Sequence, residues 1–323
     1  LAVARDAGEE LNDFHAGLEV TLAAMMLSPE FLFRVETSEY DAASGAQRVT
    51  SLAMASRLSY FLWNSTPDEE LLAAGERGDL VTDTGLEAQV DRLLASPRVE
   101  QSVRTFFADM YGFDAIDQGL VRKDPELFPA FSQEMIRDAA EQTLRVISDT
   151  LLANDGDYRE LFTTRHSFMT RALGPVYRVP VLSADGWEPY DFATDSQRAG
   201  VLTHVSLLSL HSHPGRGSPT LRGKFVREVI LCQDVPPPPG NIDFSMFASD
   251  ENQKRSTARE RLKAHVSSPA CAGCHTLMDP LGLPLETMDG IGIERTTENG
   301  QVIDPSGDVD GAPFDDAPGL GAR

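Results

Sequence analysis

The sequence is poor in cysteine, in basic residues and in long apolar runs. Three cysteines among 323 residues are too few for the disulfide framework of a small secreted domain. No stretch of about 18 apolar residues occurs, so no membrane-spanning helix is predicted. Lysine and arginine number 28 against 50 aspartates and glutamates, which gives a formal net charge of −22. This sign excludes nucleic acid as a partner, because nucleic-acid affinity comes largely from cations placed against phosphates.

The beginning of the sequence also lacks the marks of a secretory leader. It reads LAVARDAGEELNDFHAG, without a methionine, a basic segment or an apolar core. We therefore expect a mature product or a fragment of a longer protein, in which a leader has been removed or lies upstream.

What the sequence does contain is a succession of helical patterns. Apolar residues recur at helical spacing over residues 12–36, 52–63, 86–94, 99–110 and 132–152. Pro29 is expected to split the first of these helices near Ser28. Further helix starts are expected at Thr66-Pro67, at Asp157 with Glu160, at Ser218-Pro219 and at Thr257. No β alternation is evident before residue 165, so the predicted fold class is mainly α.

Two of the three cysteines stand in Cys271-Ala-Gly-Cys274-His275, the pentapeptide that attaches c-type haem. Thiols one helical turn apart can add to the two vinyl groups on one edge of the porphyrin. The following imidazole then lies under the ring as the proximal iron ligand. Ser268-Pro269 predicts that a helix begins at the motif, and Asp279-Pro280 predicts that it ends about a turn after the histidine. The predicted cofactor is one covalent haem c.

Three alternatives for the cysteine pair are open. A zinc site usually needs four ligands, and only Cys232 and scattered histidines are available besides the motif. A thioredoxin-like redox pair would need a βαβ context, which this region lacks. A Cys271–Cys274 disulfide is the third. Cys232, the odd thiol, would pair with a cysteine outside this chain or stay free and buried.

The ligand on the opposite face of the iron decides the chemistry. We rank His213 first, His211 and Met288 next, and an open or water-bound site fourth. The two histidines stand in a Gly/Pro-rich loop that can present a side chain, and Met288 follows the motif closely enough to wrap over the ring. Met278 lies on the proximal side, and His265 is expected to interact with the end of its own helix. Methionine ligation raises the potential, whereas an open site permits small-molecule chemistry.

Cations near the motif are candidates for neutralising the haem propionates. Arg222 and Lys224 are the first choice, and Arg216 and Arg295 could act likewise. The alternative is that all four are solvated surface cations of an acidic protein, with no role at a haem.

Longer stretches of the sequence resemble a known domain pair. CAGCH at 271–275, DPLG at 279–282 and LETMDGIG at 285–292, with His265 upstream, resemble the planctomycete-type cytochrome domain (H…CxxCH…DPxG…LExxDxxG). GVLT at 200–203 and SPTLRGK at 218–224 are similar to the first half of that domain. LSPEFLFRVE at 27–36, RLSYFLW at 57–63 and PDEEL at 67–71 resemble the uncharacterised helical domain that precedes it. The resemblance implies a large, exported, multidomain protein with a haem cofactor.

These observations combine into a prediction of domains and function. We expect a multi-helix domain of unknown function over residues 1–175, an irregular connection over 176–194, and a smaller, loop-rich, cytochrome-c-like haem domain over 195–323. The leading hypothesis is an exported c-type cytochrome, periplasmic or extracellular because covalent haem is attached after export. It would transfer electrons rather than catalyse, with a basic redox partner. A larger extracytoplasmic assembly is a further candidate setting. The alternatives are a peroxidase-like haem enzyme with an open distal site and a surface structural or assembly protein with a structural haem or metal.

Overall fold

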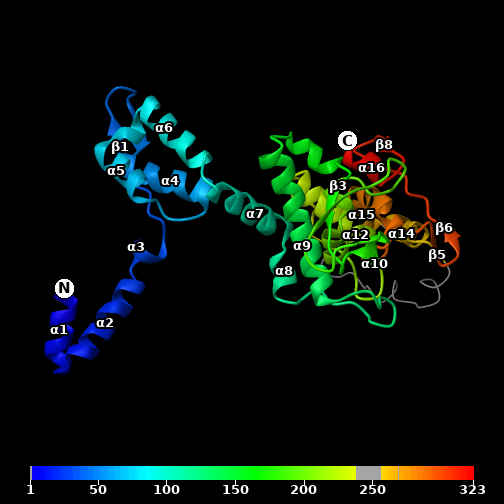
Figure 1. The fold of residues 1–323 in the computed structure, drawn as a ribbon, viewed down its shortest axis with the longest axis horizontal. Helices are drawn as coiled ribbons and strands as arrows, with labels where there is room; N and C mark the ends of the chain where they lie inside the picture. Colours follow the sequence, from blue (N-terminus) through cyan, green and yellow to red (C-terminus); the bar gives the residue numbers. More distant parts are fainter. Residues whose placement is uncertain (1, 238–255, 268) are drawn as a thin grey trace. The chain divides into compact units, whose positions relative to one another are not determined.

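The computed structural model describes residues 2–237, 256–267 and 269–323. The chain is mainly α-helical, as predicted, and its sheets are small two-stranded antiparallel pairs (Figure 1). It forms two compact units, Leu1–Ser102 and Val103–Arg323.

The first unit is a set of helices with one β hairpin and one 3-10 turn. Its elements are α1 (Ala2–Leu11), α2 (Phe14–Met26), α3 (Pro29–Leu32), β1 (Ser38–Asp41), β2 (Ala46–Val49), α4 (Ser51–Trp63), α5 (Glu69–Arg77), the 3-10 turn Asp79–Val81 and α6 (Asp83–Leu94). The buried core lies among α4, α5 and α6, where the indole N–H of Trp63 donates to the carbonyl of Leu93 at 2.9 Å.

Two predictions about the first unit differ in outcome. Ser28 separates α2 from α3 and caps α3 by accepting from the backbone N–H of Phe31, so the predicted split is confirmed. The predicted start at Thr66-Pro67 is wrong, because Asp68 caps α5 instead. Its carboxylate accepts from the N–H of Leu71 and also pairs with Arg92 at 2.7 Å, which holds it at the helix start.

The apolar pattern of residues 12–36 does not mark a core face. Its members are exposed in α2 and α3, among them Phe14, Leu22 and Met25. α2 packs instead on α1 through Gly17, where a Cβ would lie 2.5 Å from the backbone N of Gly8. The hairpin β1–β2 was not expected either, since most of its positions are exposed and no hydrophobic alternation marks it.

The second unit contains the longer part of the chain, and α7 (Arg98–Tyr111) crosses the division. Its helices are α8 (Asp114–Asp117), α9 (Gln133–Ser148), α10 (Gly174–Tyr177), α11 (Val205–Leu210), α12 (Pro219–Phe225), α14 (Ala258–Ser267), α15 (Pro269–Gly282) and α16 (Ala317–Gly321), with π turns at Asp149–Ala153 and Val226–Ile230 and 3-10 turns at Tyr158–Phe162, Val201–Thr203 and Leu283–Thr287. Its strands pair as β3 (His166–Met169) with β4 (Glu188–Asp191), β5 (Thr297–Glu298) with β6 (Gln301–Val302), and β7 (Gly307–Val309) with β8 (Ala312–Phe314).

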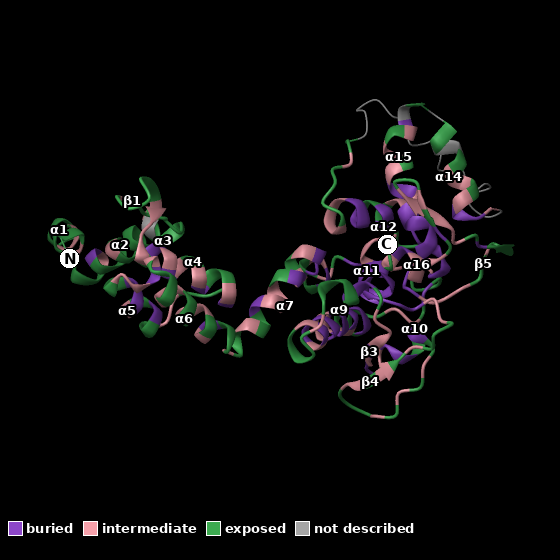
Figure 2. Cartoon of the chain, turned by 90° about the horizontal axis from the view of Figure 1, so that it is seen from above, coloured by how far each residue is buried: buried purple, intermediate pink, exposed green. Residues whose placement is uncertain are grey.

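One hydrophobic core runs through the whole second unit. Its members extend along the sequence from Phe107 to Leu320, and Figure 2 shows buried ribbon where α9, α11 and α12 lie. Tyr177 connects the segments before and after residues 176–194. Its hydroxyl donates to Gln142 on α9 at 2.6 Å and accepts from the N–H of Val205 on α11 at 3.0 Å.

The compact units therefore divide at a different residue from the connection expected at 176–194. Residues on both sides of that connection belong to one core, and the connection itself contains β4. The domains 1–175 and 195–323, which were expected from the sequence, remain a prediction.

Candidate functional site

The CAGCH motif lies near the start of α15. Ser268, its expected capping residue, lies outside the described residues. The helix continues through Pro280 to Gly282, so the prediction that Asp279-Pro280 ends it is wrong. Proline removes one backbone donor, but packing against α12 keeps the following turn in place.

The crossing of α12 and α15 is close enough to require glycine. A Cβ on Gly223 of α12 would lie 1.8 Å from the carbonyl oxygen of Met278, and a Cβ on Gly282 of α15 would lie 1.8 Å from that of Pro219. Ser218 caps α12, as predicted, by accepting from the N–H of Leu221 at 3.3 Å. Both helices therefore meet backbone to backbone beside the motif.

The two motif cysteines are free thiols on consecutive turns of one helix. Cys271 is buried and Cys274 is half-buried, and the structure has no disulfide between them. The thiol of Cys274 lies 3.1 Å from the carbonyl oxygen of Pro236 and donates to it. Cys232, the third cysteine, is an exposed free thiol.

His275 is oriented by a carboxylate that sequence reasoning assigned no functional role. Its Nδ1 lies 2.9 Å from Oδ2 of Asp279, one turn further along α15. Oδ1 of Asp279 accepts from the hydroxyl of Thr220 on α12 at 2.9 Å, and only 3% of Asp279 is exposed. The i,i+4 spacing of His275 and Asp279 was the available signal, whereas Thr220 comes from a distant segment.

The predicted propionate partners have other contacts in the structure. Arg222 is fully buried and donates to Oε1 of Glu286 at 2.9 Å and to the carbonyls of Leu285 and Met288. Arg295 pairs with the other carboxylate oxygen of Glu286 at 3.0 Å. Lys224 is exposed, with its nearest acid at 3.5 Å, Glu228. The role of Arg222 and Lys224 toward a propionate stays a prediction.

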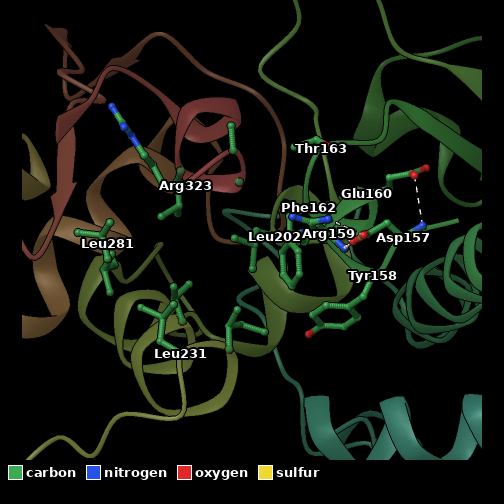
Figure 3. A pocket seen from close by; sticks show the side chains of 16 residues that line it. Asp157, Tyr158, Arg159, Glu160, Phe162, Thr163, Leu202, Leu231, Leu281 and Arg323 are labelled. Carbon is green, nitrogen blue, oxygen red and sulfur yellow. Dashed lines mark hydrogen bonds and ion pairs between the residues drawn. The ribbon is translucent and has the colours of Figure 1, made fainter. Parts of the chain in front are cut away.

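A pocket of about 620 Å³ lies apart from the motif (Figure 3). Its apolar wall includes Phe162, Leu202 and Leu231, and charged residues such as Arg159 stand among its lining. α15 contributes Leu281 to the lining, but Cys271, Cys274 and His275 do not belong to it. The pocket is therefore distinct from the candidate haem-attachment residues.

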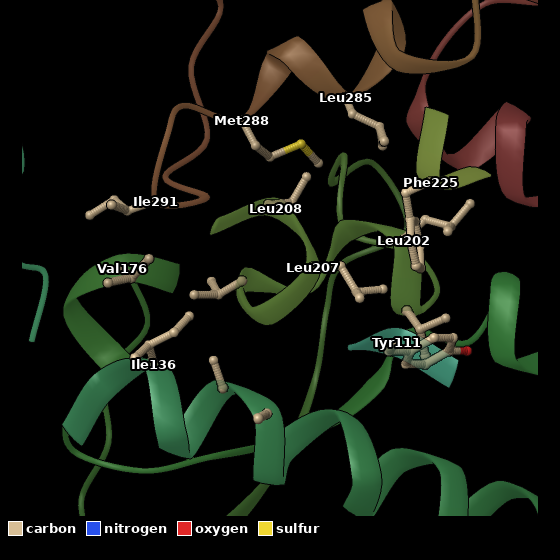
Figure 4. Packing of buried hydrophobic residues seen from close by; sticks show 14 of the residues in the cluster. Tyr111, Ile136, Val176, Leu202, Leu207, Leu208, Phe225, Leu285, Met288 and Ile291 are labelled. Carbon is tan, nitrogen blue, oxygen red and sulfur yellow. The ribbon is translucent and has the colours of Figure 1, made fainter. Parts of the chain in front are cut away.

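The three candidate distal ligands have different surroundings. Met288 is fully buried in the core beside Leu208 (Figure 4), with its sulfur 3.2 Å from the hydroxyl of Thr287. His211 stacks on Phe225 at 4.4 Å between ring centroids. Burial, and then the nearby Arg222, lower the pKa of His211 to about 4, so its imidazole is neutral at pH 7.

The histidines differ in what their ring nitrogens contact. Nε2 of His211 is buried without a hydrogen-bond partner among the described residues. His213 is more open, its backbone bridges to Arg216, and burial lowers its pKa. The side chain of His265 lies outside the described residues. The order His213, His211, Met288 stays a prediction. Of the three, His211 has both a neutral ring at pH 7 and a buried ring nitrogen without a hydrogen-bond partner among the described residues.

Two features are absent from the described ranges. Residues 2–237, 256–267 and 269–323 contain no group of three or more His, Cys, Asp or Glu side chains that could hold a metal ion. The same residues form no helix with the length and apolar character needed to cross a bilayer.

The fold and the site together define a mainly helical protein with a cysteine pair and a carboxylate-oriented histidine on one helix. Two family matches accompany this geometry. Residues 49–179 match PSD4, described as a protein of unknown function (DUF1592), and residues 198–298 match PSCyt3, described as a protein of unknown function (DUF1588). These matches are consistent with the planctomycete cytochrome-type domains, and the second name hints at a cytochrome-like role. No curated protein and no solved structure matches the chain.

Proposed function

We propose that the chain is an exported c-type cytochrome that carries one covalent haem c and transfers electrons. The observation that carries the proposal is the arrangement on α15: two free thiols one turn apart, followed by a histidine held by a buried carboxylate. A bound haem supplies an iron that gains and loses one electron.

The donor set fits covalent attachment. Each thiol, from Cys271 and Cys274, would add across one vinyl group, forming a carbon–sulfur bond while its hydrogen passes to the other vinyl carbon. No oxidant or reductant is consumed. Because neither cysteine is in a disulfide, both are available for this addition. Nδ1 of His275 faces Asp279, so Nε2 is the atom suited to the iron.

Compartment and partner follow from the same proposal. Covalent haem is attached after export, so the protein would work in the periplasm or outside the cell. The net charge of −22 favours a basic redox partner, because opposite charge speeds encounter. Membership of a larger extracytoplasmic assembly is part of the same proposal. Electron exchange with that partner should slow as ionic strength rises.

The test is covalent haem on natively produced protein. We expect the intact mass to include one haem and the pyridine haemochrome spectrum to be that of haem c. Cys271→Ser with Cys274→Ser should lose the added mass, whereas Cys232→Ser, which alters an exposed free thiol outside the motif, should retain it. Wild-type protein without haem mass, made in cells competent to attach haem c, would overturn the proposal.

A haem enzyme with an open distal site is the second candidate. It is favoured by Met288, whose sulfur lies in the core beside Thr287 and not in an open loop. Binding of carbon monoxide or cyanide separates the two functions. A low-spin spectrum that neither ligand changes supports electron transfer, and ready binding supports the enzyme. The third candidate is a surface structural or assembly protein with a structural haem or metal. For it we expect electron exchange with a redox partner to be too slow for electron transfer to be its function.

A further inference from the structure

We propose that Asp279 is a positioning residue that fixes the ring of His275 and holds the iron at a low reduction potential. The inference rests on the proposed haem and deepens it, because it assigns the feature that tunes that site. The carboxylate is buried and both its oxygens are used, one by His275 and one by Thr220.

The hydrogen-bond pattern selects one tautomer of His275. Oδ1 of Asp279 already accepts from Thr220, and Oδ2 lies 2.9 Å from Nδ1 of His275, where a carboxylate oxygen accepts a hydrogen bond and the ring nitrogen donates it. We therefore infer that Nδ1 carries the proton. The lone pair is then on Nε2, the nitrogen through which the ring would ligate a metal. The contact also fixes the rotation of the ring, because Asp279 itself is held from a second helix.

The two close helix contacts flank the bond between Thr220 and Asp279. One joins Gly282 to the carbonyl of Pro219, and the other joins Gly223 to the carbonyl of Met278. Pro219 precedes Thr220, and Met278 precedes Asp279, so both partners of the hydrogen bond are next to fixed backbone. The carboxylate therefore has little freedom to leave His275.

The negative charge has an electronic consequence for a bound iron. A carboxylate on the far nitrogen of a ligating histidine raises the basicity of the ring. A more basic ligand stabilises ferric over ferrous iron and so lowers the reduction potential. A neutral amide at the same position would hold the ring less strongly and add no charge.

The test compares Asp279→Asn with Thr220→Val in the holoprotein, by spectroelectrochemical titration. We expect both variants to retain covalent haem. For Asp279→Asn we expect the ferric/ferrous preference to change by about tenfold or more, which for a one-electron couple raises the potential by about 59 mV or more. Thr220→Val should move the potential in the same direction and by less. A merely structural contact would lower the melting temperature of both variants and leave the potential unchanged.

A second measurement needs no haem. NMR of apoprotein labelled with ¹⁵N-histidine reports the tautomer, and the His275 signals are assigned by their loss in His275→Gln. We expect the Nδ1–H tautomer in wild type and a mixture with Nε2–H in Asp279→Asn. Wild-type apoprotein with Nε2–H at His275, or unchanged potentials in haem-loaded variants, would overturn the positioning role. Wild type that shows the Nδ1–H tautomer but carries no haem mass would overturn the proposed function, and with it the effect on the potential, and would leave the positioning of His275 by Asp279 in place.

Discussion

Arg222 and Lys224 have the same charge and the same predicted role, but Arg222 is buried and Lys224 is exposed. Both are cations on the same short helix, two positions apart, and both are candidates for a haem propionate. An α-helix turns by about 200° over two residues, so one of the pair faces the core when the other faces solvent. The sequence does not say which. The structure buries Arg222 among backbone carbonyls and Glu286 and leaves Lys224 exposed.

This difference predicts unequal effects of the same substitution. Arg222→Met should lower the free energy of unfolding by about 3–5 kcal/mol, since it leaves buried carbonyls without a donor and Glu286 with Arg295 as its remaining partner. Lys224→Met should change it by less than about 0.5 kcal/mol. Urea denaturation of both variants measures the two values. Equal, small effects would mean that the buried network contributes little and that Arg222 is available to another partner.

At the scale of helices, the contact of α12 with α15 depends on two glycines. Gly223→Ala would place a methyl group 1.8 Å from the backbone carbonyl oxygen of Met278. No rotamer change relieves this contact, because the position of a Cβ is fixed by the backbone that carries it. The helices must move apart, and we expect a loss of at least about 3 kcal/mol in the free energy of unfolding.

Gly273 provides a matched control within α15. It lies between the two motif cysteines and is exposed. Beyond its own stretch of helix, no atom of the described residues lies within 4 Å of a Cβ built on it. Gly273→Ala should raise the free energy of unfolding by about 0.5–1 kcal/mol, because alanine is the better helix former. A loss at Gly273 as large as that at Gly223 would contradict the role assigned to the crossing. Thermal or urea unfolding of both variants makes the comparison.

Local signals predicted the elements best. Ser28, Ser218 and the pair Asp157–Glu160 cap as expected, because a cap involves neighbouring residues alone. The helix end at Pro280 was predicted wrongly, since packing between distant segments keeps that turn helical. Asp279 could be paired with His275 from spacing, but Thr220 could not, because its contact depends on how two separate helices cross.

At the scale of the whole chain, the second unit has one core to which residues before and after 176–194 both contribute. Tyr111 and Phe225 meet at 5.8 Å between ring centroids, and α11 packs on α9. A fragment limited to 195–323 would lose the α7 and α9 side chains and expose the apolar face of α11. We therefore expect the smallest part that folds around the motif to begin near residue 98, at the start of α7.

Two fragments test this expectation against the domains predicted from the sequence. Residues 98–323 should unfold in one cooperative thermal transition and carry haem when produced natively. Residues 195–323 should show no cooperative transition and should bind a hydrophobic dye, because α9, on which α11 packs, is missing. Circular dichroism melting of both fragments decides the question. If 195–323 melts cooperatively, the boundary at 176–194 separates folding units, and the shared core of the second unit adds stability without being required for the fold.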